Sequence, residues 1–348
     1  MSLQASRGKT RRGFTGTSGL NSARMNFYRF LTAALLLAAA ICLCSFTAAQ
    51  ENPQPPKQTI QVNVERVNVG VIVTDHGGHF VEGLHRKDFR VFDNGVEQPV
   101  RGFTAVEEPA QVLLLIEAGP AVHLLGNNHV RASDKLLNNL SPNDRVAIAS
   151  YSRSPELLLD FTADKPTARF ALQNLSFALG FGELNLASSL ASAIDWLGAS
   201  PGKKTLVVLS TGVDTSPPSK WQGIEQKLKT SDVRILAVSL SGDFRKPAKS
   251  RKLSPQERED RAWVKQVFSQ ADQALDELAQ AAGGRVYLPK NEKEFDRAYS
   301  EIAQLVRHEY SIAFNPPAKD GQVHAIQVKV KRWGCRADHR QAYLAPPS

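Results

Sequence analysis

Residues 112–121 read V-L-L-L-I-E-A-G-P-A, and this stretch decides the fold. Five apolar residues run directly into one carboxylate, Glu117, which is soon followed by a glycine and a proline. A continuous apolar run of this length, bounded by turn residues, is typical of a parallel strand that is buried on both faces. We therefore expect Glu117 to lie where a buried strand ends and a loop begins.

Similar apolar runs recur through residues 109–308, and stretches with helical spacing separate them. This alternation predicts an α/β fold, in which helices flank a doubly wound, mostly parallel sheet. In such sheets the binding residues lie at the carboxyl ends of the strands. Three segments are expected at this edge. Residues 116–121 and 209–214 each lie where a buried strand ends, and residues 182–186 form a turn.

Strand patterns flank this predicted α/β domain on both sides. Residues 58–108 alternate apolar and polar side chains and contain an Asn94-Gly95 turn signal, so they predict a small β unit. Residues 309–348 contain two further strand patterns and a tail. We therefore expect the α/β domain to lie between two β segments.

The first 49 residues have the composition of an export signal. The stretch from Phe30 to Gln50 carries no charge, and Arg24 and Arg29 precede it. This pattern predicts either a cleaved signal peptide or an uncleaved signal anchor, and Met25 would begin a conventional signal. A Pro-rich linker follows at residues 50–57. We expect the folded part to be exported to the periplasm, the cell envelope or the outside of the cell.

The net charge of +9 comes mainly from this N-terminal segment. Six of the 43 basic residues lie before residue 50, where there is no acidic residue, so 37 basic residues face 34 acidic residues in the rest. Such a balance does not indicate a nucleic-acid-binding surface. Removal of a signal would also remove Cys42 and Cys44, so Cys335 would be left without an internal disulfide partner.

Three segments carry a resemblance to a known family. They are the β unit that contains VNVGVIVTDHGGHFVEGLHRKDFRVFDNGVEQPV, the segment LDELAQAAGGRVYLP, and the ending from YSIAFNPPAKDGQ onward. Together they resemble the exported bacterial proteins that carry a von Willebrand factor type A (VWA) domain, as found in acidobacteria. The resemblance spans about residues 58–346 and implies a Rossmann-like sheet and a role in protein binding.

The resemblance also implies a place for a metal-ion-dependent adhesion site, in which Asp-x-Ser-x-Ser, a Thr and an Asp hold Mg²⁺. In this chain Glu117, Gly119 and Ala121 stand at the first three ligand positions, Leu184 at the Thr and Thr211 at the Asp. Only Glu117 and Thr211 offer side-chain oxygens, while Asn185 and Asp214 lie nearby in the sequence. We therefore expect a degenerate site that holds no metal, with Mg²⁺ binding by atypical ligands as the alternative.

Glu117 itself has two interpretations. In the first, it is a structural carboxylate that accepts hydrogen bonds from loop N–H groups or from Ser210 and Thr211, because a buried charge must be paired. In the second, it serves as the anion that is offered to a basic partner.

Residues 242–262 are rich in charge and contain proline, so they predict a loop. This loop would leave the carboxyl end of its strand and reach the same sheet edge as Glu117. Its cations form a candidate recognition surface for an acidic partner: Arg245, Lys246, Lys249, Arg251 and Lys252.

These observations predict an exported, non-enzymatic module that binds another envelope or extracellular protein without a cofactor. The sequence contains no nucleophile elbow, phosphate-binding loop or zinc-protease motif, so no catalytic residue is assigned. A structural envelope component and a metal-dependent adhesion module are the alternatives, and a hydrolase that uses Glu117 or Asp214 is a weaker one. Contact with a membrane is expected only through an uncleaved N-terminal segment.

Overall fold

The computed structural model describes residues 66–106, 109–120, 122, 128–177, 182–243 and 254–347. These residues belong to one compact unit that begins at Asn63. The predicted export signal, the linker at 50–57 and the five cations of the predicted recognition loop lie outside the described residues. In the part that is described, no helix has the length and apolar character needed to cross a membrane.

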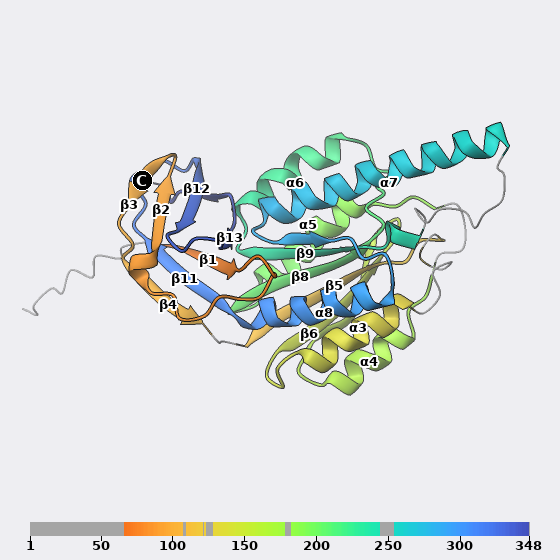
Figure 1. The fold of residues 1–348 in the computed structure, drawn as a ribbon, viewed down its shortest axis with the longest axis horizontal. Coiled ribbons are helices and arrows are strands. Elements are labelled where there is room, and N and C mark those ends of the chain that lie inside the picture. Colours follow the sequence, from red (N-terminus) through yellow and green to blue (C-terminus); the bar gives the residue numbers. More distant parts are fainter. Residues whose placement is uncertain are drawn as a thin grey trace, which may run out of the picture. The chain divides into compact units, whose positions relative to one another are not determined.

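A six-stranded sheet forms the centre of residues 109–308, with the strand order β10-β9-β8-β5-β6-β7. Five of its strands run parallel, and β7 pairs antiparallel with β6. The prediction of a mostly parallel sheet flanked by helices is confirmed (Figure 1). The strands are β5 (Ala110–Glu117), β6 (Arg145–Tyr151), β7 (Pro155–Thr162), β8 (Lys203–Ser210), β9 (Val233–Ser239) and β10 (Arg285–Tyr287).

The apolar run before Glu117 supplies both faces of this sheet. Every residue of β5 is buried. Val112, Leu114 and Ile116 face one helical layer, while Leu113 and Leu115 face the other, because successive side chains of a strand point to opposite faces. The first layer contains α3 (Asn128–Asn139), α4 (Lys165–Gln173) and α8 (Glu292–Arg307), and the second contains α5 (Leu186–Gly198), α6 (Ser219–Thr230) and α7 (Pro255–Ala281).

The helix α7 begins earlier than its sequence suggested. The predicted loop at 242–262 is wrong for residues 255–262, because these residues form the first turns of α7. Ser254 accepts a hydrogen bond from the backbone N–H of Glu257, and the Glu257 carboxylate accepts one from the N–H of Ser254. This capping box satisfies N–H groups that otherwise lack partners at a helix start. The high charge of the segment concealed this signal in the sequence.

The two flanking β segments combine into one sandwich. One sheet has the order β13-β1-β11-β4 and the other β14-β12-β2-β3, so each contains strands from both segments. The sequence predicted two strands after residue 308, and the structure has four, because β13 and β14 are too short to show alternation. The strands are β1 (Val67–Thr74), β2 (Phe89–Asp93), β3 (Val96–Gln98), β4 (Gly102–Val106), β11 (Glu309–Phe314), β12 (Val323–Val330), β13 (Arg336–Asp338) and β14 (Ala342–Leu344).

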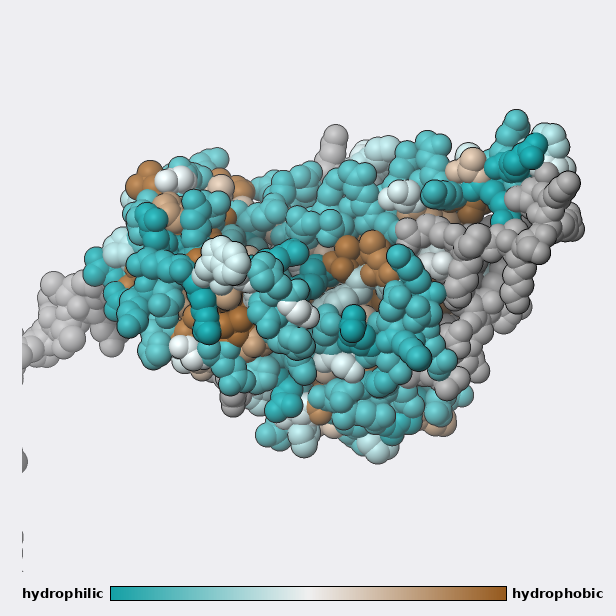
Figure 2. Space-filling view, viewed as in Figure 1, coloured by the Kyte–Doolittle hydropathy of each residue, from teal (hydrophilic) through white to brown (hydrophobic). Residues whose placement is uncertain are grey.

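Aromatic and branched side chains fill the space between the two sheets of the sandwich. Phe89 of β2 packs against Phe103 of β4 and Tyr310 of β11, with ring centroids 5.5 and 5.3 Å apart. The predicted Asn94-Gly95 turn is confirmed, since both residues have positive φ angles of 46° and 83°. The described residues also form two short 3-10 helices, η1 (Arg86–Asp88) and η2 (Ser241–Asp243). On the face shown in Figure 2, the surface is mostly hydrophilic, with small hydrophobic patches.

Candidate functional site

Glu117 is fully buried at the carboxyl edge of the six-stranded sheet. Its Oε2 atom accepts hydrogen bonds from the Thr211 N–H at 2.7 Å, the Ser210 hydroxyl at 3.1 Å and the Tyr151 hydroxyl at 3.3 Å. The Thr211 hydroxyl lies 2.8 Å from Oε2 and 3.0 Å from Oε1. The predicted hydrogen bonds to Ser210 and Thr211 are therefore present. Tyr151 was not predicted, because its contact depends on the pairing of β6 with β5.

These four residues meet because each lies at the end of a strand or directly after one. Glu117, Tyr151 and Ser210 are the last residues of β5, β6 and β8, and Thr211 follows Ser210. Parallel pairing aligns the three strand ends, with Glu117 directly opposite Tyr151. The meeting of these side chains thus follows from strand lengths and register.

The electrostatics of this cluster are those of a closed interior. Burial raises the pKa of Glu117, and the hydrogen bonds from Thr211, Ser210 and Tyr151 offset this only in part. Burial, followed by the charge of Glu117, raises the pKa of the Tyr151 hydroxyl well above its usual value. Tyr151 and Ser210 also bond to each other at 2.6 Å. The Tyr151 hydroxyl therefore stays protonated, and its single proton is donated to Glu117 or to Ser210.

Leu184 covers the side of Glu117 at which the expected hydroxyl is missing. A β-carbon added to Gly119 would lie 2.8 Å from Leu184 Cδ2 and 3.4 Å from Glu117 Oε1. The backbone of Leu184 is fixed by Thr215, whose N–H donates to the Leu184 carbonyl and whose hydroxyl accepts from the Leu184 N–H, both at 2.8 Å. Gly119 and Leu184 are thus complementary in volume. Ala121 lies outside the described residues.

Asn185 and Asp214 hold the beginning of α5. The Asn185 side chain accepts a hydrogen bond from the Ser188 N–H at 3.1 Å. The Asp214 carboxylate accepts from the N–H groups of Ala187 at 2.9 Å and Ser216 at 2.7 Å. Both side chains therefore satisfy helix and loop donors and complement the positive end of the helix dipole.

A comparison with protein-family models shows what part of this region is similar to. Residues 127–213 match the family model of the von Willebrand factor type A domain. We call residues 109–308, which contain most of the strands and helices around this match, the VWA-like domain. No match was found among curated proteins.

Solved structures of related fold resemble the chain only distantly. A von Willebrand factor type A protein from Catenulispora acidiphila shares 13% identity with a TM-score of 0.44 and covers 74% of each chain. An aerotolerance-related membrane protein from Bacteroides fragilis NCTC 9343 shares 13% identity with a TM-score of 0.41, covering 57% of this chain and 98% of its own. The PilB minor pilin from Streptococcus sanguinis shares 12% identity with a TM-score of 0.41, covering 60% of this chain and 63% of its own.

A second buried carboxylate lies near the same edge of the VWA-like domain. Asp272 of α7 accepts hydrogen bonds from the hydroxyls of Ser239 at 2.5 Å and Ser241 at 2.9 Å, beside the end of β9. Sequence reasoning missed this cluster, although S-L-S after a buried strand and an acid within the apolar face of a helix were visible signals. Gly212 lies between the two clusters, next to Thr211 in the chain and against Ala271 of α7. Its φ is +77°, and a β-carbon added to it would lie 2.7 Å from the Ala271 carbonyl oxygen, so there is no room for a side chain here.

A shallow cleft opens on the solvent side of Leu184. Its volume is about 220 Å³. Arg153 and Glu183 rim it and form an exposed ion pair with a distance of 3.8 Å. Such a pair contributes little to stability, so these charges are available to a partner. The cleft is lined by Gly119, Pro120, Ser152, Arg153, Gly182, Glu183 and Leu184. In the described part of the chain, no three His, Cys, Asp or Glu side chains converge as a metal site would require.

Proposed function

We propose that this protein is an exported, non-enzymatic module that binds another envelope or extracellular protein through the carboxyl edge of its VWA-like sheet, without a metal ion. The observation that carries the proposal is the closure of Glu117. Protein donors contact both of its carboxylate oxygens, and an apolar side chain covers the neighbouring backbone.

The residues at this edge do not fit a magnesium ion. Mg²⁺ requires near-octahedral oxygen ligands at about 2.0–2.1 Å, several of them water molecules. Glu117 is fully buried, and the position expected to hold a Thr holds Leu184 instead. Thr211 donates both its N–H and its hydroxyl to Glu117. Opening this site to a hydrated ion would break these bonds and move Leu184.

The burial of the edge hydroxyls supports a non-enzymatic role. Tyr151, Ser210 and Thr211 are each at most 1% exposed. A substrate could not reach them without a rearrangement of the loops, so a hydrolytic use of Glu117 has no geometric support. The exposed rim of Arg153 and Glu183 is instead suited to a partner that presents both charges.

Export is part of the same proposal. It is supported by the charge-free stretch from residue 30 to residue 50 and the arginines before it. N-terminal sequencing of the native protein tests it. We expect a start near Gln50 or a full-length chain held in the membrane, and a soluble cytoplasmic chain with residues 30–49 intact would contradict it.

The metal-free mechanism is tested by thermal unfolding. A ligand that binds only the folded state raises the melting temperature, so a working site would respond to millimolar Mg²⁺ or Mn²⁺ and the response would be reversed by EDTA. We expect no such response. The matched variant restores the expected ligands with Glu117→Asp, Gly119→Ser, Ala121→Ser, Leu184→Thr and Thr211→Asp, and we expect a response there. A saturable, EDTA-reversible stabilisation of the native chain that disappears in Glu117→Ala would overturn the metal-free proposal.

The binding surface is tested by affinity capture of the full chain from an envelope extract. We expect the same partner to be retained in EDTA and in Mg²⁺, and Arg153→Glu to weaken its capture by at least about tenfold. Lys229→Glu is the matched control, because Lys229 also forms an exposed ion pair but lies on α6. Capture that requires Mg²⁺, or that is reduced equally by both variants, would contradict the proposed surface.

A further inference from the structure

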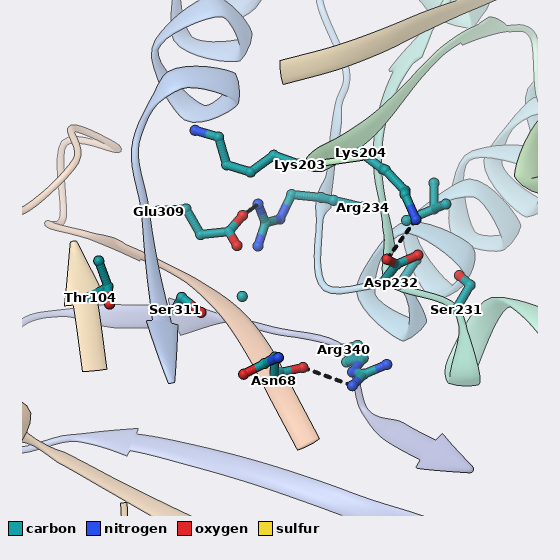
Figure 3. Close-up of a pocket in the computed structure, with 14 residues that line it drawn as sticks. Asn68, Thr104, Lys203, Lys204, Ser231, Asp232, Arg234, Glu309, Ser311 and Arg340 are labelled. Carbon is teal, nitrogen blue, oxygen red and sulfur yellow. Dashed lines mark hydrogen bonds and ion pairs between the residues drawn. The ribbon is translucent and has the colours of Figure 1, made fainter. Parts of the chain in front are cut away.

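A second and larger cavity lies at the opposite edge of the VWA-like sheet. Its volume is about 380 Å³, which falls within the range of about 300–1,000 Å³ that is usual for ligand pockets. It is lined by the amino ends of β8 and β9 on one side and by the sandwich strands β1, β4 and β11 on the other (Figure 3). The cavity lies at the amino ends of the sheet strands, whereas Glu117 lies at their carboxyl edge. The cavity is therefore separate from the proposed protein-binding surface.

The alternation of the sandwich strands makes one wall of this cavity polar. Thr104, Ser311 and Gly70 stand side by side across three strands. Their chain neighbours point to the opposite face, where they form the sandwich core. A β-carbon on Gly70 would meet the carboxylate of Glu309, so the absence of a side chain at this position leaves room for that carboxylate. The wall therefore presents hydroxyl groups and one carboxylate.

The opposite wall supplies cations, and two of them are already paired. Lys204 contacts Asp232 at 2.8 Å, and Arg234 contacts Glu309 at 2.6 Å. The Arg234–Glu309 pair is largely buried, with side chains 9% and 16% exposed. The two acidic residues that line the cavity are thus both engaged. The lining carries additional positive charge beyond these two ion pairs.

Arg340 provides that additional charge. Its Nη1 and Nη2 atoms donate to the backbone carbonyls of Thr230 at 3.2 Å and Asn68 at 2.8 Å. Its Nε is buried and has no hydrogen-bond partner. Across the described residues, no carboxylate lies within ion-pair distance of this guanidinium. Burial lowers the pKa of Arg340, and the nearby charge of Asp232 offsets this only in part.

Arg340 is held in place before any ligand binds. A β-bridge joins its backbone to Ala282, directly after α7. Together with the two carbonyl contacts, this bridge fixes the guanidinium beside the polar wall, as Figure 3 shows for Asn68 and Arg340. A preorganised, desolvated guanidinium binds oxyanions with a smaller entropic cost than a flexible surface cation does.

We propose that this cavity binds a small polar solute that carries an oxyanion, either a phosphate or a carboxylate group. The oxyanion supplies the countercharge of Arg340, and the polar body of the solute is bound by Asn68, Thr104 and Ser311. Arg is well suited to such a group, because its planar fork matches the geometry of phosphate and carboxylate oxygens. The proposal concerns a binding site only and involves no reaction.

Isothermal titration calorimetry of the full chain tests the proposal. The probes are inorganic phosphate, citrate and glucose 6-phosphate, with glucose as the neutral control and sodium chloride at matched ionic strength. We expect saturable binding of at least one oxyanion and none of glucose, and the preferred probe distinguishes a phosphate from a carboxylate ligand. No oxyanion binding beyond that of chloride would overturn the proposal.

Two variants connect the binding to this cavity. We expect Arg340→Met to weaken the binding at least about tenfold. Arg145→Met is the matched control with unchanged binding, because Arg145 also donates to a backbone carbonyl, that of Phe161, but lies outside the cavity. Equal affinity in the native chain and in Arg340→Met would overturn the assignment.

A third variant keeps the test decisive if Arg340→Met unfolds. Ser311→Leu fills the cavity from β11 and leaves every cation in place. We expect it to unfold cooperatively like the native chain and to lose oxyanion binding. Undiminished binding in the folded Ser311→Leu variant would place the oxyanion elsewhere and contradict the proposal.

Discussion

At the scale of single residues, Glu117 shows how a carboxylate is retained in a fold without access to solvent. Burying a charge is costly unless hydrogen bonds replace those of water. Three side chains and one backbone N–H provide them here, and burial still raises the pKa of Glu117. Because the donors point at the carboxylate from neighbouring strand ends, Glu117 fastens the loop after β8 to the end of β5.

The fit between Gly119 and Leu184 gives a prediction about coupling. Gly119→Ser alone should destabilise the fold by about 1–3 kcal/mol, because its β-carbon would approach Leu184 too closely. Leu184→Thr alone should also destabilise it, through lost packing and a buried hydroxyl. The double variant should be more stable than the sum of the two changes predicts, by about 0.5–3 kcal/mol, in denaturant unfolding.

The matched control for this cycle is Gly223→Ser on α6, since nothing lies within 4 Å of a β-carbon added there. We expect that substitution to change the unfolding free energy by no more than about 0.5 kcal/mol and to show no coupling to Leu184→Thr. Strict additivity of Gly119→Ser and Leu184→Thr would mean that Leu184 does not occupy the space over Gly119.

At the scale of elements, α7 divides into two parts with different roles. Its buried residues begin at Ala271, so the first sixteen residues of this 27-residue helix contribute none to the core. In Figure 1 this part extends beyond the helices beside it. Short-range interactions therefore have to sustain it, and the capping box at Ser254 and Glu257 provides two of those at its beginning.

We predict that Ser254→Ala changes the local stability of α7 but not the global stability. Loss of an N-cap costs about 0.5–2 kcal/mol, and here that cost falls on turns outside the core. Amide hydrogen exchange should accelerate at residues 255–262, while the denaturant midpoint stays unchanged. Ser300→Ala is the control, because Ser300 lies within α8 and bonds to the Asp296 carbonyl instead of capping a helix. A lower midpoint for Ser254→Ala would show that the first turns support the core.

His324 joins three elements of the sandwich and should make its stability depend on pH. Its Nδ1 contacts Asp93 of β2 at 2.8 Å and its Nε2 contacts Asp320 at 3.2 Å, while Asp93 also accepts from Tyr343 of β14. Burial alone would lower the pKa of His324, but its hydrogen bonds to Asp93 and Asp320 and their charges outweigh burial and raise it.

The raised pKa of His324 fixes the direction of the pH effect. The protonated form is favoured in the folded state, so its contribution is fully present below the ordinary histidine pKa of about 6.5 and is lost as pH rises through the folded value. We expect stability, measured by denaturant unfolding, to decrease across that interval. In His324→Gln the decrease should be smaller, whereas in the control His85→Gln, an exposed histidine, it should persist. Identical pH profiles for the native chain and His324→Gln would contradict this.

Some helices and strands could be predicted from the sequence and others could not, for physical reasons. The strand before Glu117 was evident because burial on both faces demands an unbroken apolar run. β13 and β14 were missed, since three residues cannot show a period of two. The hydrogen bonds of Glu117 to Ser210 and Thr211 could be predicted from aligned strand ends. The position of the Leu184 side chain over Gly119 could not be predicted, because it depends on how a loop folds over the sheet edge.

At the scale of the whole molecule, the sandwich closes only when both ends of the described chain are present. β1 pairs with β11 and β13, and β2 pairs with β12, so neither flanking segment forms a complete sheet alone. The sequence divided these strands into two separate segments, since strand patterns carry no information about partners that are more than 200 residues away.

We predict that deletion of residues 309–348 exposes residues 66–106 to proteolysis. Val69 and Val71 of β1 would lose the Tyr310 and Ile312 side chains that share their core. Limited proteolysis followed by mass spectrometry should find early cuts within 66–106 in the deletion variant. The control is a chain that ends at Pro346, which keeps the bond from Gly321 N–H to the Pro346 carbonyl and should resist like the native chain. Equal resistance of residues 66–106 in the deletion variant would mean that the first segment folds alone.

The interleaving of the two ends also decides which part of the molecule bears mechanical load. Residues 66 and 347 both adjoin sandwich strands, whereas the VWA-like domain leaves the sandwich after β4 and returns to it at β11. Tension applied between residues 66 and 347 therefore runs through the β12–β14 ladder at one end and the β1–β11 and β1–β13 ladders at the other, all of them in the sandwich and none in the six-stranded sheet. A pull on the chain ends would strain the sandwich first, and the edge that carries Glu117 would keep its geometry until the sandwich yields.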